Sequence, residues 1–304
     1  MIDRRSLRRP ARPRGGSRRA AARFAPAARW PPAMLLWLLA GCASAPLDRA
    51  GTLQSYDRLE PANGLVTRSL LEVSPDDVLV ARTVKIVPTV FSDPAARTPL
   101  TAEQRRLVAN AVDRALCAAL SERFAVVRPS EHADLTVHAV VTQLTPTDPV
   151  AAGLSKGGSV AKSILLPGVP GPVPRIPVGL GSLSLEAEAR DPAGRPQAAM
   201  VWGRGATVLF GPTRIAENGD AYVLAAEFGA DFGKLLVTGR SPFGGLPSPP
   251  SLEKIGHLLG KAPKYPACEA FGRPPGLVGL LGEQVGAPPS WTDQGAAPAA
   301  AATE

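Results

Sequence analysis

Proline and glycine limit which parts of this chain can fold into a compact domain. The 304 residues include 33 prolines and 30 glycines, which are enriched in residues 146–180 and 241–304. Proline has no N–H for a sheet ladder, and its density in residues 167–177 favours extended polyproline II structure. We therefore expect one α+β domain over residues 61–240, with a Gly/Pro-rich excursion at 146–180 and a largely disordered tail at 241–304.

The first 41 residues have the order of an export signal. Ten arginines and one acidic residue precede residue 42, and an apolar core occupies residues 33–40. This core is far shorter than the ~20 residues of a membrane-spanning helix, so it predicts a cleaved signal peptide over residues 1–41. From Cys42 onward the chain has 24 basic and 25 acidic residues. Because the positive charge belongs to the signal peptide, we expect no nucleic-acid partner.

The signal peptide ends in Leu39-Ala40-Gly41-Cys42, which resembles the lipobox of bacterial lipoproteins. The resemblance implies cleavage between Gly41 and Cys42 and lipid on the Cys42 sulfur, so the membrane is the expected partner. Two or more acyl chains anchor a protein stably. Asp is absent directly after the cysteine, and by resemblance to the sorting rules of Gram-negative lipoproteins this implies the inner leaflet of the outer membrane, facing the periplasm. We interpret residues 42–60 as a lipidated tether.

Hydrophobic periodicity predicts two long helices, at residues 100–123 and 219–238. Thr101 and Gln104 fit a capping box at the start of the first helix, and Gly239 fits the end of the second. The apolar face of the first helix holds Val108, Val112, Ala115, Leu116 and Ala119. Its opposite, polar face holds Arg106, Asn110, Asp113 and Cys117.

Strands are predicted at residues 78–90, 124–127, 134–145, 181–190 and 198–210. Residues 181–190 alternate between apolar and polar side chains, which is typical of a half-buried strand, so we expect Glu186 and Glu188 on a solvated face. Hairpin-linked strands with separate helices predict an α+β fold, with an antiparallel sheet and two helices packed on one face.

With these elements placed, the chain resembles a proteobacterial lipoprotein family known as domain of unknown function 3313 (DUF). The resemblance covers about residues 51–240. It is carried by residues 51–59, 84–88, 100–105, 133–137, 181–191 with Gly194, and 219–221. Each segment alone is only weakly specific for the family, but the order in which the segments follow one another is much more specific. The resemblance implies a lipid-anchored envelope protein, and it implies no activity.

Two serine motifs fall in the excursion. Ser155 is the serine of a G-x-S-x-G string, and Ser159 with Lys162 matches S-x-x-K. The first motif needs a preceding buried strand and the second needs companion motifs, and both requirements are unmet in the sequence. We interpret the motifs as chance matches and expect no enzyme. A serine hydrolase using Ser155 or Ser159 is the alternative.

Three residues near one predicted strand suggest a metal site, namely His132, Asp134 and His138. On a strand, the Cα atoms of Asp134 and His138 are about 13 Å apart, which is too far for one ion to bridge. His257 stands alone in the tail. We therefore expect no metal and no cofactor.

Two cysteines follow Cys42. Cys117 lies on the predicted polar face of a helix and Cys268 lies in the tail. Export leads to an oxidising compartment, where an exposed thiol is a liability. Our hypothesis is a disulfide between Cys117 and Cys268 that holds the tail across the first helix. The alternative is two free thiols.

The favoured function is a non-catalytic binding or structural module of the cell envelope. Extended Pro-rich segments dock well into grooves on other proteins, so the excursion is the expected contact with an envelope protein partner. Its apolar contact residues are Ile164, Leu165, Leu166 and Ile176. A further alternative, an accessory protein that carries lipid for transport, requires a pocket between sheet and helices.

Overall fold

The computed structural model describes residues 45–154, 179–207, 214–244, 256, 259–273, 275–285, 287–293 and 295. Its strands are β1 (Glu60–Pro61), β2 (Thr67–Val73), β3 (Thr83–Ile86), β4 (Val90–Phe91), β5 (Ala125–Val126), β6 (Leu135–Thr145), β7 (Ser182–Arg190) and β8 (Pro196–Gly205). Its helices are α2 (Pro75–Val80), α3 (Asp93–Ala96), α4 (Ala102–Leu120), α6 (Gly219–Thr238), the 3₁₀ helix η2 (Pro266–Phe271), α8 (Gly276–Val285) and α9 (Pro289–Thr292).

The strands form one mixed sheet in the order β1-β2-β8-β7-β6-β3-β5, with β4 also paired to β6. From β1 to β6 along this order, neighbouring strands are antiparallel. However, β3 and β4 run parallel to β6, and β5 runs parallel to β3. The α+β class is confirmed. The expectation of a wholly antiparallel sheet is wrong at this edge, because α4 forms a crossover that returns the chain to the same end of the sheet.

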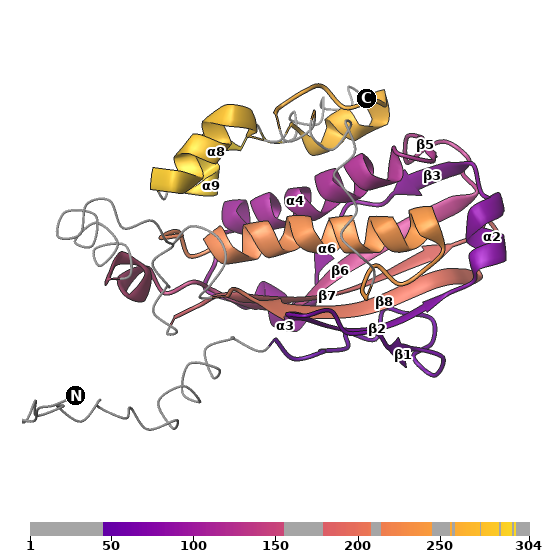
Figure 1. Ribbon diagram of the computed structural model, residues 1–304, viewed down its shortest axis with the longest axis horizontal. Coiled ribbons are helices and arrows are strands. Elements are labelled where there is room, and N and C mark those ends of the chain that lie inside the picture. Colours follow the sequence, from indigo (N-terminus) through magenta and orange to yellow (C-terminus); the bar gives the residue numbers. More distant parts are fainter. Residues whose placement is uncertain are drawn as a thin grey trace, which may run out of the picture. The chain divides into compact units, whose positions relative to one another are not determined.

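Helices α4 and α6 lie side by side on one face of the sheet (Figure 1), as predicted. A Cβ atom on Gly229 would lie 2.6 Å from the Ala115 Cβ and 2.7 Å from the Val112 carbonyl oxygen. One turn further on, a Cβ on Gly233 would meet the Ala119 side chain. Glycine in α6 opposite alanine in α4 therefore lets the two backbones approach closely.

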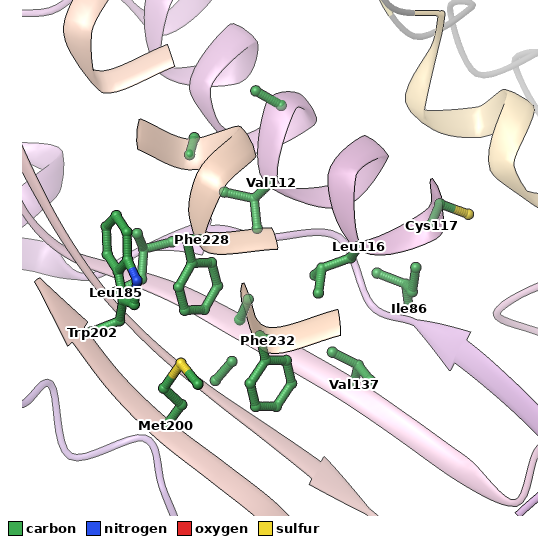
Figure 2. Packing of buried hydrophobic residues seen from close by; sticks show 14 of the residues in the cluster. Ile86, Val112, Leu116, Cys117, Val137, Leu185, Met200, Trp202, Phe228 and Phe232 are labelled. Carbon is green, nitrogen blue, oxygen red and sulfur yellow. The ribbon is translucent and has the colours of Figure 1, made fainter. Parts of the chain in front are cut away.

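Large apolar side chains fill the space between these helices and the sheet (Figure 2). The ring of Trp202 meets that of Phe228 edge-on at 5.6 Å, and Phe228 stacks on Phe232 at 6.1 Å. The Trp202 indole N–H donates to Asp231 Oδ2 at 3.0 Å, which satisfies the buried donor. Where a lipid carrier would need a pocket, the described residues form a packed core.

Local sequence signals set several element boundaries. Thr101 Oγ1 accepts from the Gln104 N–H at 3.1 Å, and Gln104 Oε1 accepts from the Thr101 N–H at 2.8 Å, so the capping box is confirmed. Gly239 ends α6 with a φ of 63°, a left-handed conformation that favours glycine.

The strand expected at 78–90 is partly wrong. Pro75, followed by two aspartates, begins helix α2 instead, and strand pairing is restricted to β3 and β4.

The tail packs against α4, where the sequence suggested a largely disordered segment. A disulfide joins Cys117 to Cys268 at a Cα separation of 5.9 Å. Further along, the Arg114 Nη1 group donates to Asp293 Oδ1 at 3.1 Å, and the ion pair is buried. The described part of the tail contains η2, α8 and α9. Cys117 is therefore buried rather than on a solvated face, because the tail covers this side of α4.

Asp113 is a second exception to the predicted polar face of α4. Its side chain is buried against the segment between β3 and β4. The Thr89 N–H donates to both carboxylate oxygens at 3.1 Å, and the Thr89 hydroxyl donates to Oδ1 at 2.6 Å. Burial raises the pKa of Asp113 to about 6, although the bonds from Thr89 and the charge of Arg114 oppose this shift.

This pKa predicts a pH-dependent stability. The folded-state pKa of Asp113, about 6, lies above the ordinary value of 3.8. Between these two pH values, the Asp113 carboxyl holds a proton in the folded state that it has released in the unfolded state. The free energy of unfolding should therefore fall by about 2–3 kcal/mol as the pH rises from 4 to 6. Urea denaturation of the protein and of Asp113→Asn isolates this term, because the variant cannot titrate at this site. If the free energy of unfolding changed equally with pH in the two proteins, the prediction would be contradicted.

Candidate functional site

Residues 45–59 lie on the face of the sheet opposite the helices (Figure 1), and we call them the N-terminal strap. Leu53 is buried against Ala199 and Val201 of β8. Leu47, Tyr56, Leu59 and Leu70 surround this small cluster. The strap thus gives the centre of the sheet a second apolar layer, and β7 is buried on both faces.

Glu186 of β7 holds the middle of the strap. Its Oε1 atom accepts from the Thr52 N–H at 3.0 Å and also from the Thr52 hydroxyl. Its Oε2 atom accepts from the Tyr56 hydroxyl at 2.7 Å and from the Ala50 N–H at 3.3 Å. The carboxylate is fully buried, and these four donors provide the hydrogen bonds that a buried charge requires.

Glu188 repeats this arrangement two residues further along β7. Its Oε1 atom accepts from the Gln54 N–H at 3.1 Å. Its Oε2 atom accepts from Arg190 Nε at 2.5 Å, and the Arg190 Nη2 group in turn donates to the Thr52 carbonyl oxygen at 3.3 Å. Alternate side chains of β7 therefore bind alternate residues of the strap.

The environment of Tyr56 supports the direction of these hydrogen bonds. Burial raises the pKa of the Tyr56 phenol, and the hydrogen bond to Glu186 and that carboxylate's charge raise it further. The phenol therefore stays protonated and donates. Its oxygen also accepts from the Gly51 N–H at 2.9 Å, and the Arg49 guanidinium lies 5.1 Å from its ring centroid.

Two expectations about these residues are wrong. Glu186 and Glu188 were expected on a solvated face, but the strap covers that face and buries both. Residues 42–60 were interpreted as a tether, but from Ala45 onward they pack on the sheet. The one sequence signal of this packing is the regular spacing of three large side chains, Leu53, Tyr56 and Leu59.

The structure gives Asp134 a backbone-binding role. Its Oδ2 atom accepts from the Arg82 N–H at 2.8 Å and the Thr83 N–H at 2.9 Å, and these bonds lower the pKa of the carboxyl. Burial lowers the pKa of His138, and the nearby charge of Arg190 lowers it further. Within the described residues, no cluster of three His, Cys, Asp or Glu side chains has the arrangement of a metal site.

Other candidate residues lie outside the described residues. These are Gly41, Cys42, Ser155, Ser159, Lys162, Ile164, Leu165, Leu166, Ile176 and His257. The residues just before Ser155 are described, and they form a helical turn at 149–154. A nucleophilic serine of the G-x-S-x-G type follows a strand, whereas the residues before Ser155 form a helical turn.

Together these contacts define a class of α+β domain in which two helices cover one face of the sheet and the N-terminal strap covers the other. The chain belongs to the family described as protein of unknown function (DUF3313), whose model matches residues 48–232. The match includes the strap from Asp48 onward and both glutamates. The two longest segments of the family resemblance, 51–59 and 181–191, are therefore the two that bind each other.

No curated protein matches the chain in sequence. Among solved structures, a PelC dodecamer from Paraburkholderia phytofirmans aligns at 10% identity with a TM-score of 0.32, covering 58% of this chain and 99% of that one. A variant of that dodecamer aligns at 10% identity with a TM-score of 0.30, covering 60% and 98%. Likeness at this level assigns no function.

The site predicts the effect of removing one buried charge. In Glu186→Gln the amide NH₂ group faces donors that it cannot accept from, so the free energy of unfolding should fall by about 2–4 kcal/mol. Trypsin should also cut faster after Arg49 and Arg58 in the folded protein. Glu60→Gln, which changes an exposed glutamate on β1, is the matched control and should behave like the unaltered protein. Wild-type stability and cleavage in Glu186→Gln would refute the role of this carboxylate.

Proposed function

We propose that the mature chain begins at Cys42, carries lipid on that sulfur, and serves as a non-catalytic envelope module at the inner leaflet of the outer membrane. The basic, apolar and small-residue order of residues 1–41 and the Leu39-Ala40-Gly41-Cys42 sequence support the anchor. Ala43 and Ser44 directly follow the cysteine, and neither is Asp, which by resemblance to Gram-negative sorting rules supports the outer membrane as the destination. In the described parts of the chain, no helix has both the length and the hydropathy to cross a bilayer.

The observation that carries this proposal is the position of the strap. Ala45, the first described residue, is already buried, and the Ser184 hydroxyl donates to the Pro46 carbonyl oxygen at 2.6 Å. Three residue steps separate Cys42 from Ala45, which span at most about 11 Å of extended chain. Lipid on Cys42 would therefore hold the folded domain directly at the membrane surface, without a long spacer.

Two features support a binding or structural role over catalysis. The acidic pair of β7 is committed to the strap and to Arg190, so these carboxylates are not available as a general acid and base. The layer between sheet and helices is a packed core. As the contact with an envelope protein we propose residues 153–177, which follow β6 and precede β7 in the sequence.

The anchor is tested by removing the sulfur. Cys42→Ser should abolish incorporation of a clickable palmitate and shift the protein out of the outer-membrane fraction, because the other two cysteines are joined to each other. Ser44→Ala, in the same segment, is the matched control and should leave labelling and fractionation unchanged. Palmitate incorporation in Cys42→Ser, or its unaltered fractionation with the membrane, would refute the proposed anchor.

A further inference from the structure

Where the strap enters the domain determines which end of the sheet lies nearest the anchor. Pro46 is bonded to Ser184, near the start of β7, and its carbonyl oxygen would lie 2.8 Å from a Cβ on Gly203, near the end of β8. Ser182 pairs with Thr145 at the end of β6 and with Gly205 at the end of β8. We call this end of the sheet the anchor end.

Helix α6 begins at the anchor end. The Asp220 carboxylate accepts from the Gly181 N–H and the Thr147 hydroxyl, each at 3.0 Å. The Thr147 N–H also donates to the Glu217 carbonyl oxygen at 2.8 Å. These bonds tie the first turn of α6 to the end of β6 and the start of β7.

The tail returns to the same end. Tyr222, in the first turn of α6, donates its hydroxyl proton to Asp293, and Arg114 binds both residues. A small hollow at this contact is lined by Gly219 and Tyr222 of α6 and by Pro275, Pro289 and Thr292 of the tail. Figure 1 shows α9 beside the beginning of α6, with α8 next to α9. The start of α8 and all of α9 therefore lie at the anchor end.

This end exposes apolar side chains on three elements. In α8, three large apolar residues are 60–70% exposed, and in α9 the Trp291 side chain is 78% exposed. The helical turn at 149–154, which follows β6, exposes two more. The residues of this apolar surface are Val150, Leu154, Leu277, Val278, Leu281 and Trp291. Leu277 and Leu281 are four residues apart and share one helical face.

We propose that this apolar surface rests on the lipid bilayer, with α8 and Trp291 in the interfacial layer. The proposal rests on the anchor at Cys42, which lies within about 11 Å of Ala45 along the chain, where the strap enters this end of the sheet. Amphipathic helices enter the interface to a depth of ~5–10 Å, and tryptophan is enriched there. A lipid surface is the occupant that we propose, because the strap enters the domain at the same end of the sheet as these residues. The strands then point toward the membrane, and α2 at the other end of the sheet points away.

Tryptophan fluorescence tests this orientation directly. After signal-peptide cleavage the chain retains two tryptophans, of which Trp202 is fully buried and Trp291 is exposed. The lipidated protein is placed in phosphatidylethanolamine–phosphatidylglycerol vesicles whose acyl chains carry bromine. Trp291 emission should shift to the blue and lose most of its intensity, and Trp291→Phe should abolish this quenching, because the core shields Trp202.

Charge substitutions at the two ends of the domain separate docking from anchoring. Leu281→Asp should reduce the quenching of Trp291, whereas Val80→Asp should not, because Val80 is also exposed but lies on α2 at the far end of the sheet. Water-like emission from Trp291 in lipidated, vesicle-bound protein would overturn the proposal while leaving the anchor intact. A dimer that Leu281→Asp dissociates would overturn it in favour of a second copy as the occupant. An unlipidated N-terminal peptide in the mass spectrum would overturn the anchor as well.

Discussion

The structure depends on two buried carboxylates. Glu186 and Glu188 extend from the centre of the sheet toward the face that the helices leave open. A carboxylate in such a place is stable only if donors surround it, since the loss of hydration costs more than any single contact returns. Backbone N–H groups of Ala50, Thr52 and Gln54 are those donors. These N–H groups belong to no sheet ladder, so the strap amides and the two carboxylates satisfy each other's need for hydrogen bonds.

These hydrogen bonds between the strap and the two glutamates explain why the sheet can be buried on both faces. One face packs against α4 and α6 through a core centred on Trp202 and Phe228. The other packs against Leu53 of the strap. Because the strap closely follows Cys42, the hydrogen bonds between β7 and the strap link the fold to the site that we propose is lipidated. The proposed orientation of the domain at the membrane rests on this link.

The sequence revealed the features that are encoded locally. The Thr101 capping box, the strand at residues 181–190 and the glycine that ends α6 all depend on neighbours within a few residues, and each appears in the structure. What the sequence misplaced depends on distant segments. Glu186 is buried by residues 130–136 positions away, and Cys117 is covered by a tail 151 residues further on. Periodicity reports which side of an element is polar, and it cannot report what later covers that side.

Hydrogen exchange of the strap tests the central claim most directly. In the intact protein, the amides of Ala50, Thr52 and Gln54 should exchange as slowly as those of β7, because opening them requires removing the strap from two buried carboxylates. Mass spectrometry of the peptide that spans residues 45–59 measures this protection. Exchange of these three amides at the rate of an unstructured chain would show that the strap is a loose tether, and it would contradict the account.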